Sequence, residues 1–390
     1  MSVSGASQAR PARPLRVAWF GHLQSPHGNG LAAYSRETVA ALRGRGVDVL
    51  FFAHREGHAR PGPARDVELR ALRLKTVTIS LPGSLERISA ALTEFQPDLV
   101  HLSVSFSLLD GAVASLAHHR NVPAVATVHL PYGTLASARA RILHELYRFH
   151  SRSLTRFDSL IALSEGQRAL LVDSGLDPDR ILVSPNGVDT EHFTPGPSQL
   201  REAVQGRFVV VYMGRLDPEK RVPELARSFI AQRWPEDHLL LIGGAGTQRR
   251  QLVRLAATHP PVRLLGVVEG AEARRDLLRA ADLFVLPSTA EGLSLALLEA
   301  MSVGCAVIAT DAGEDGAALG DAGAVIPVYP LEPGLGSALG RLYDDPALRR
   351  TLSKRARDRA VARYSLRGNI DRLESLYGSL LNGRLPHTAP

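Results

Sequence analysis

The chain has 390 residues, a hydrophobic share of 45% and a single cysteine, Cys305. This length favours two domains. One cysteine excludes a disulfide framework and fits a reducing compartment, and no apolar run reaches the roughly 18 residues needed to span a bilayer. The net charge of +7 and the pI of about 9.9 indicate an anionic partner, for which a nucleotide, an anionic membrane and a nucleic acid all qualify.

The first predicted element is a strand at 15–20 that runs into a glycine-rich loop and then a helix at 31–43. The preceding polar residues, 1–14, lack the apolar segment of a secretory signal, so we expect a disordered tail. A strand, a glycine loop and a helix in this order can cradle a phosphate. The spacing of the glycines is not that of the dinucleotide fingerprint, and a simple tight turn is the alternative. The candidate phosphate- and acceptor-binding residues are Gly28, Asn29 and Gly30.

A histidine ends one of the next predicted strands. We expect strands at 47–53, 76–79, 97–102 and 122–129, and the last of these ends at His129. The carboxyl ends of parallel strands line the crevice in which open α/β sheets bind ligands. His129 is therefore a candidate site residue, and a structural histidine that caps the following loop is the alternative.

The stretch 138–157 has the pattern of a basic amphipathic helix. Ile142, Leu146 and Phe149 share one helical face, and such a helix can lie on an anionic bilayer. In the alternative, the apolar face packs on the sheet and the arginines are solvated, and both can hold together. The arginines that populate the rest of its surface are Arg139, Arg141, Arg148, Arg152 and Arg156.

The second half of the chain repeats the pattern of the first, after a proline- and glycine-containing stretch at 191–206 that is the best candidate for a linker. A strand at 208–213 is followed by a turn that contains Gly214, Arg215 and Lys220. Lysine is a compact point charge and arginine offers a planar fork, so the two cations together can neutralise a diphosphate. The alternative is a pair of solvated charges in a loop.

The most informative stretch follows an apolar strand at 282–286. Pro287 and Gly292 interrupt the apolar pattern, and a helix begins near Ser294. Free N–H groups at such a helix start favour an anion, which Gly292 allows to approach closely. Glu291 lies in the turn and Glu299 about two helical turns further on, so the two carboxylates can meet opposite ends of an extended ligand such as a nucleotide-sugar. A solvated helix face is the alternative.

The sequence Glu291-Gly292-x6-Glu299-Ala300-Met301 resembles the E-x7-E signature of the family-4 retaining glycosyltransferases. The Gly-Arg-Leu…Glu-Lys segment at 214–220 is similar to a second motif of that family. The resemblance implies an α/β protein of the GT-B fold, in which two Rossmann-like domains face a central cleft. It implies an acceptor-binding domain at 15–192, a nucleotide-sugar-binding domain at 205–365, and a C-terminal helix at about 366–382 that crosses back onto the first domain.

The resemblance also implies roles for the candidate residues. Arg215 and Lys220 would stabilise the leaving diphosphate. Glu291 would bind hydroxyls of the donor sugar and Glu299 the ribose, while His129 would fix the sugar. The backbone around the start of the second-domain helix would help to bind the donor, and the residues concerned are Gly214, Gly292, Leu293, Ser294 and Leu295. Glu314 follows Gly313 where many relatives have a second glycine, a departure that bears on donor choice.

We expect no cofactor and no bound metal. The Asp177-Pro178-Asp179 sequence lies in a predicted turn, and GT-B enzymes do not need a metal. The resemblance implies front-face substitution that retains configuration, in which a sugar moves from a nucleoside diphosphate to an acceptor hydroxyl. The sequence does not identify the sugar, the base or the acceptor.

The high pI and the basic helix favour a lipid-linked or glycan acceptor at the cytoplasmic face of a membrane, to which the protein would bind peripherally. A soluble sugar or small-molecule acceptor is the alternative. A GT-B nucleotide-sugar epimerase or a phosphorylase-like enzyme would share the fold. A non-catalytic basic protein that binds a membrane or nucleic acid would explain the charge, but it would not explain Arg215, Lys220, Glu291 and Glu299 in register. We therefore expect no nucleic-acid partner.

Overall fold

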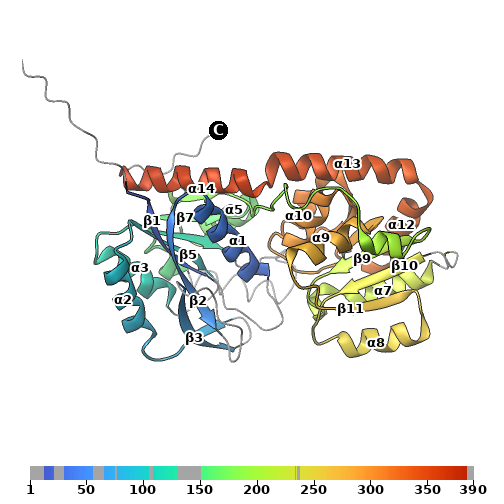
Figure 1. Cartoon of the computed structure of the whole chain (residues 1–390), viewed down its shortest axis with the longest axis horizontal. Coiled ribbons are helices and arrows are strands. Elements are labelled where there is room, and N and C mark those ends of the chain that lie inside the picture. Colours follow the sequence, from blue (N-terminus) through green and yellow to red (C-terminus); the bar gives the residue numbers. More distant parts are fainter. Residues whose placement is uncertain are drawn as a thin grey trace, which may run out of the picture.

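The computed structural model describes residues 13–21, 30–55, 66–74, 77–104, 109–129, 151–232, 234 and 238–383. They form two lobes, each built on a largely parallel sheet with helices around it (Figure 1). The architecture is the two-domain α/β arrangement that the sequence predicts.

The sheet of the first lobe has the strand order β4-β3-β2-β1-β5-β6-β7-β8, and its pairs are parallel except for β3 with β4. Its strands are β1 (Arg16–Phe20), β2 (Asp48–Arg55), β3 (Val67–Leu74), β4 (Val77–Ser80), β5 (Leu99–Val104), β6 (Ala124–Val128), β7 (Ser159–Ala162) and β8 (Ile181–Val183). Its helices are α1 (Gly30–Gly44), α2 (Ser84–Phe95), α3 (Asp110–His118) and α5 (Glu165–Asp173). Strand β3, which lies between β2 and β4, has no counterpart in the prediction from sequence.

Alternating side chains of β1 enter two different cores, as the period of a strand requires. Val17 and Trp19 point into a core shared with α1. Ala18 and Phe20 point into the core beneath α2 and α3. Because both faces of this strand are buried, it is apolar throughout rather than alternately polar.

The sheet of the second lobe has the order β11-β10-β9-β12-β13-β14 and is parallel throughout. Its strands are β9 (Phe208–Met213), β10 (His238–Gly243), β11 (Val262–Gly266), β12 (Leu283–Leu286), β13 (Ala306–Thr310) and β14 (Ala324–Ile326). Its helices are α7 (Val222–Ala231), α8 (Arg249–Thr258), α9 (Ala271–Arg279), α10 (Leu295–Val303), α11 (Asp315–Leu319), α12 (Leu331–Asp344) and α13 (Pro346–Arg363). The chain reverses its direction of winding between β9 and β12, and ligands bind at such a switch point in open α/β sheets.

Helix α14 (Leu366–Leu381) returns to the first lobe and continues the line of α13 along one edge of the molecule (Figure 1). Ser365 separates the two helices and caps α14 by accepting a hydrogen bond from Gly368 N at 3.2 Å. Ile370 and Tyr377 are buried with the β1 side chains Val17 and Trp19. The chain therefore crosses between the lobes twice, and the crossings meet where the Val188 backbone bonds Tyr364 O and Leu366 N, both at 2.8 Å.

The stretch 191–206 belongs physically to the second lobe and is not a free linker. Phe193 and Val204 are buried in that lobe's core, and α6 (Gln199–Ala203) lies within the stretch. Ser198 Oγ donates to Asp276 O at 2.9 Å. The proline and glycine content that suggested a linker marks tight turns along a packed surface.

Candidate active site

The turn between β12 and α10 carries Glu291 and Gly292, as expected. It packs against the turn after β13, and Gly313 (φ +59°) makes this close approach possible, because a Cβ atom there would lie 2.1 Å from Glu291 O. Glu314 N donates to Gly292 O at 2.9 Å. A Cβ atom on Gly292 would meet no protein atom within 4 Å, so this side of the turn is open to a ligand.

The structure brings Lys220 and Glu291 together from turns 71 residues apart, and the amine of Lys220 donates to Glu291 Oε1. The side chains are only 12% and 11% exposed. Lys220 ends a short 3-10 turn (Pro218–Lys220) after β9, and Thr289 N donates to Glu219 O at 2.8 Å, which ties this turn to the one after β12. A desolvated ion pair thus lies at the switch point of the second sheet.

Arg215 lies on the same loop but has different partners. Its guanidinium pairs with Asp217 and with Glu219, the latter at 2.7 Å, and its side chain is 48% exposed. Tyr212 Oη donates to Arg215 O at 2.6 Å and fixes the backbone. Gly214 N donates to Gly243 O at 3.0 Å, so this turn packs against the end of β10. Lys220 is therefore the enclosed cation of the predicted pair, and Arg215 the accessible one.

An internal carboxylate caps the start of α10. Ser294 N donates to Asp315 Oδ1 at 2.8 Å, so one of the backbone groups predicted to meet an anion already has a partner. Asp315 is buried, and burial followed by the charge of Glu291 raises its pKa well above the usual value. Leu293 O accepts from Asn186 Nδ2 at 3.2 Å. The predicted site residue Leu295 is the first residue of α10.

Two adjacent acidic residues of the β13–α11 turn belong to this cluster. Glu314 was expected to bear on donor choice, whereas Asp315 was not a candidate. Burial raises the pKa of Glu314 to about 7, and Asp315 is almost fully buried. A local signal existed, because acidic residues in a glycine turn at the carboxyl end of a parallel strand lie in the ligand crevice. Together with Glu291 they give the site more carboxylates than the sequence motifs alone indicate.

Glu299 lies on α10 with its carboxylate buried against Arg274 of α9. Arg274 Nη2 donates to Glu299 Oε1 at 2.9 Å and also reaches Glu37 Oε1 of α1 at 3.4 Å. Burial raises the pKa of Glu299 to about 7, while Arg274 acts in the opposite direction. Neither Arg274 nor Glu37 was predicted from the sequence, since both are ordinary charged residues of amphipathic helices.

His129 follows directly after β6, at the carboxyl end of that strand, and its side chain is buried. Its backbone N–H donates to Val104 O at 3.3 Å. Its ring packs edge-on against the ring of Tyr34, with the centroids 4.7 Å apart. Burial, followed by the charge of His101, lowers the pKa of His129 to about 3. The imidazole is therefore neutral at physiological pH and is suited to hydrogen bonding rather than to general acid catalysis.

The predicted phosphate loop lies largely outside the described residues, which exclude Gly28 and Asn29; Gly30 is the first residue of α1. The basic helix is also only partly described. Arg139, Arg141 and Arg148 fall outside, and residues 151–154 are helical. Arg152 is exposed. Arg156 donates to Gly111 O at 3.2 Å, so it has a structural contact with α3.

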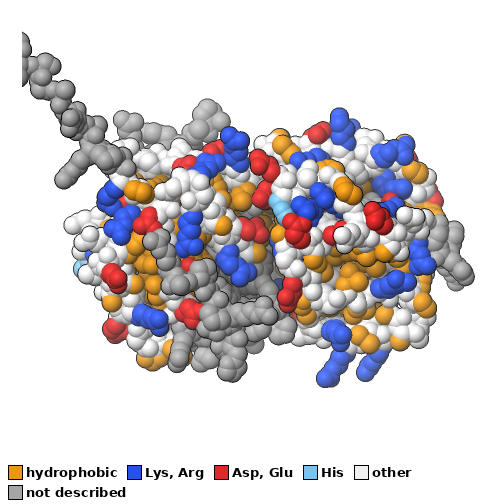
Figure 2. Space-filling view, in the orientation of Figure 1, with side chains coloured by type: hydrophobic (Ala, Val, Ile, Leu, Met, Phe, Trp, Pro, Cys, Tyr) orange, Lys and Arg blue, Asp and Glu red, His pale blue; other side chains and the backbone are white. Residues whose placement is uncertain are grey.

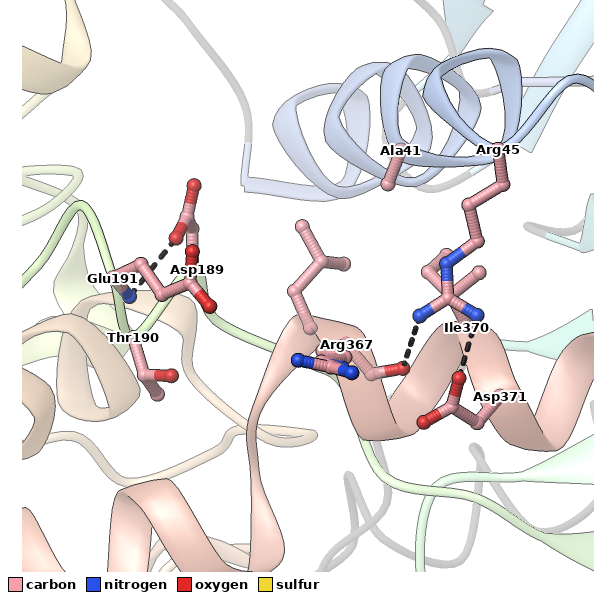
Figure 3. Close-up of a pocket in the computed structure, with 9 residues that line it drawn as sticks. Ala41, Arg45, Asp189, Thr190, Glu191, Arg367, Ile370 and Asp371 are labelled. Atoms are coloured by element: carbon pink, nitrogen blue, oxygen red, sulfur yellow. Dashed lines mark hydrogen bonds and ion pairs between the residues drawn. The ribbon is translucent and has the colours of Figure 1, made fainter.

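A groove of about 450 Å³ lies elsewhere, where the two crossings between the lobes meet (Figure 3). It runs between α1 and α14, and no predicted site residue lines it. Arg45 points across it to Asp371, with Nη1 and Oδ1 2.5 Å apart. Its lining is Ala41, Arg45, Asp189, Thr190, Glu191, Leu366, Arg367, Ile370 and Asp371.

Figure 2 shows acidic side chains along the junction between the lobes. Within the described ranges, no group of three or more histidine, cysteine or acidic side chains is arranged to hold a metal ion. No helix in the described part of the chain combines the length and apolar character needed to cross a bilayer.

Comparison with solved structures shows the GT-B fold. Sucrose-phosphate synthase from Thermosynechococcus elongatus superimposes with a TM-score of 0.73 at 20% identity and covers 95% of this chain and 100% of its own. Anabaena HepE in complex with UDP-glucose superimposes with a TM-score of 0.73 at 18% identity, over 94% of this chain and 100% of its own. The two-lobed architecture of this chain is therefore the GT-B fold, with the paired Lys220 and Glu291 at the switch point of its second sheet.

Residues 28–192 match the model of Glycosyltransferase Family 4, and residues 207–345 match that of Glycosyl transferases group 1. The chain is 30% identical to the UDP-Gal:alpha-D-GlcNAc-diphosphoundecaprenol alpha-1,3-galactosyltransferase of Escherichia coli, over 72% of this chain and 75% of the relative. It is 29% identical to a D-inositol 3-phosphate glycosyltransferase of Kineococcus radiotolerans, over 85% of this chain and 86% of the relative. The chain belongs to glycosyltransferase family 4 and is a retaining glycosyltransferase.

Proposed function

We propose that this enzyme transfers a sugar from a nucleoside-diphosphate donor to a hydroxyl of a lipid-linked or glycan acceptor. The observation that carries the donor half of the proposal is the enclosed Lys220–Glu291 pair, which lies at the switch point of the second sheet beside the open face of Gly292. A cation next to a carboxylate that can accept hydrogen bonds from hydroxyl groups suits a ligand in which a diphosphate is attached to a sugar. The solved HepE structures with UDP and UDP-glucose support such a donor.

In the proposed reaction, the bond between the anomeric carbon and the diphosphate oxygen breaks while the acceptor oxygen bonds that carbon from the same face. The acceptor proton passes to the departing diphosphate. Lys220 and Arg215 stabilise the charge that develops on the leaving group. Glu291 accepts hydrogen bonds from sugar hydroxyls, Glu299 binds the ribose, and neutral His129 holds the sugar.

The donor assignment is tested by thermal denaturation with a panel of UDP, GDP, ADP, CDP and dTDP sugars. A ligand that binds only the native state and is present at a concentration of 100 times its Kd stabilises the protein by about 2.7 kcal/mol. We expect one base class to raise Tm clearly, with UDP sugars tested first because of the HepE complexes. The proposal fails if no nucleotide-sugar changes Tm and none is consumed with any acceptor offered. Donor turnover without an acceptor would instead indicate an epimerase.

For the acceptor, we propose a lipid-linked molecule at an anionic membrane surface on the cytoplasmic side. The name of the E. coli relative specifies a diphosphoundecaprenol acceptor, and Arg152 is exposed at the end of the predicted basic helix. Each basic residue near an anionic surface contributes about 1 kcal/mol of membrane affinity. The contact would be peripheral and sensitive to salt.

A co-sedimentation experiment with phosphatidylserine-containing liposomes tests the membrane contact. The wild type should bind at low salt and be released at high salt, and replacing Arg141, Arg148 and Arg152 with Glu should abolish binding. Arg156→Glu is not an informative variant, because that side chain contacts α3. The matched control exchanges three exposed arginines of α8 in the second lobe, Arg249, Arg250 and Arg254, for Glu and should leave binding intact. If the wild type does not bind these liposomes at low salt, the membrane proposal fails.

A soluble phosphorylated polyol is the second candidate acceptor, because several relatives bear the name D-inositol 3-phosphate glycosyltransferase. The two candidates separate in a transfer assay that offers inositol 3-phosphate in one reaction and an undecaprenyl-diphosphate-linked sugar in vesicles in another. Transfer to the former, together with no liposome binding, would replace the lipid-linked proposal.

A further inference from the structure

Three charged side chains, Glu299 among them, form a cluster that joins the two lobes. Glu37 is on α1 of the first lobe, whereas Arg274 on α9 and Glu299 on α10 belong to the second. Arg274 lies between the two carboxylates, 2.9 Å from Glu299 Oε1 and 3.4 Å from Glu37 Oε1. The exposed fractions of the three side chains are 33% for Glu37, 20% for Arg274 and 7% for Glu299.

The hydrogen bonds from Arg274 leave one oxygen of Glu299 available. Nε and Nη2 both donate to Oε1, at 3.1 and 2.9 Å, while Oε2 receives only the longer contact from Nε, at 3.3 Å. Each carboxylate oxygen has two lone-pair positions. Oε1 is therefore saturated, and Oε2 retains capacity for a hydroxyl donor such as a ribose.

The guanidinium of Arg274 is itself held in place. Its Cζ lies 5.6 Å from the ring centroid of Phe193, which is a cation–π distance. Phe193 is buried, and its carbonyl accepts hydrogen bonds from Ser302 Oγ at 2.5 Å and from Arg357 Nη1 at 3.0 Å. Arg274 consequently has a fixed orientation from which to direct the Glu299 carboxylate.

The charges that face Glu299 act in opposite directions. Burial raises its pKa to about 7, Arg274 lowers it, and Glu37 across the interface raises it. The pKa of Glu37 is also raised, and burial is the largest cause. Asp189 raises it further, whereas Arg274 and, more weakly, Arg36 and His192 lower it. Burial is thus the main reason why the pKa of Glu299 is raised, and one charged residue from each lobe modifies it.

We propose that Arg274 is a positioning residue for the nucleotide, which fixes the Glu299 carboxylate for the ribose and links it to Glu37 on the facing domain. This inference rests on the proposed function, in which Glu299 meets the ribose of the donor. It assigns a role to a side chain that lies outside both sequence motifs of the site. It also makes donor affinity depend on a residue of the acceptor-side domain.

The test is the pH dependence of nucleotide affinity, measured by isothermal titration calorimetry from pH 5.5 to 9. UDP, GDP, ADP, CDP and dTDP are first screened against the wild type, and the tightest binder is used throughout. The variants are Arg274→Gln, Arg274→Lys and Glu37→Gln. Arg275→Gln is the matched control, because Arg275 is the next residue of α9, is 25% exposed and pairs with Glu272. The ligand phosphate titrates alike with every variant, so differences between variants report the protein.

We expect Arg274→Gln to weaken binding at pH 7 about tenfold and to move the midpoint of the pH profile upward, since an ionised Glu299 loses its cation. Glu37→Gln should move the midpoint downward, because a like charge is removed. Arg274→Lys should keep the midpoint close to that of the wild type, and Arg275→Gln should change affinity by less than about twofold.

The inference is overturned if Arg274→Gln and Glu37→Gln both give the wild-type profile, or if both shift it in the same direction. Should Arg274→Gln fail to fold, Glu37→Gln decides alone: a downward shift supports the inference, and no shift overturns it. A wild type that binds none of the five diphosphates contradicts the proposed function itself. The two failures are therefore distinguishable.

Discussion

Replacing Lys220 with Ala removes the enclosed cation of the proposed diphosphate site. The amine is only 12% exposed and donates to Glu291, which is equally enclosed. A hydrogen bond to a charged group is worth about 1.5–3 kcal/mol, and in the variant the uncompensated carboxylate of Glu291 also repels the leaving diphosphate. A rise of 2.7 kcal/mol in the barrier corresponds to about a hundredfold loss in rate. We therefore expect turnover to fall at least about a hundredfold.

The same change costs stability, because one partner of a buried ion pair is left alone. The penalty reaches about 3–5 kcal/mol for a fully buried pair, and the slight exposure of this pair reduces it. We expect a measurably lower Tm with an unchanged far-ultraviolet circular dichroism spectrum. Lys220→Arg, which keeps the charge, should recover part of the activity.

The assay is the initial rate of sugar transfer at saturating donor, with Tm measured on the same preparations. Lys354→Ala is the matched control, since Lys354 is an exposed lysine of α13, and its rate should equal that of the wild type. If Lys220→Ala retained a rate within about threefold of the wild type while folded, the diphosphate role of this residue would have to be abandoned.

Three further predictions follow from the site. Arg215→Ala should also lower turnover about a hundredfold, with little change in Tm because this side chain is half exposed; near-normal turnover would exclude it from the mechanism. Activity should persist in excess EDTA, and a strict requirement for added Mg²⁺ or Mn²⁺ would contradict a leaving-group site built from side-chain cations. Burial raises the pKa of Glu314 from 4.5 to about 7, so the native state binds the proton more tightly than the unfolded chain, and stability falls as the pH rises from about 4.5 to 7. At pH 8, Glu314→Gln should therefore raise the free energy of unfolding by about 1 kcal/mol, after allowance for solvent screening, and raise Tm accordingly. At pH 4.5 it should leave Tm unchanged, and an equal effect at both pH values would contradict this reasoning.

The sequence by itself determined most of the strands and helices and placed the central motif correctly. Apolar runs bounded by glycine and proline marked β1, β9 and β12 because both faces of a central parallel strand are buried. The break at 364–365 between the last two helices was also visible locally. Since parallel strands end at one edge of a sheet, Lys220 and Glu291 were predictable as members of one crevice, although their direct contact was not.

Strand β3 escaped prediction because its sequence has a charged, irregular pattern, and its pairing with β2 on one side and β4 on the other depends on the fold rather than on periodicity. The packing of 191–206 on the second lobe was equally invisible, since prolines and glycines mark turns whether or not the segment is free. In both places, tertiary contacts decided the structure that local propensity left open.

Only the tertiary structure decided which charges meet. Arg274 and Glu299 are 25 residues apart, and Arg274 and Glu37 are 237 apart on helices of different lobes. Nothing in the local pattern distinguishes these side chains from solvated charges on an amphipathic helix. Whether a carboxylate is buried, which cation it faces and therefore where it titrates depend on the packing of α1 against α9 and α10, which no single stretch of the sequence contains.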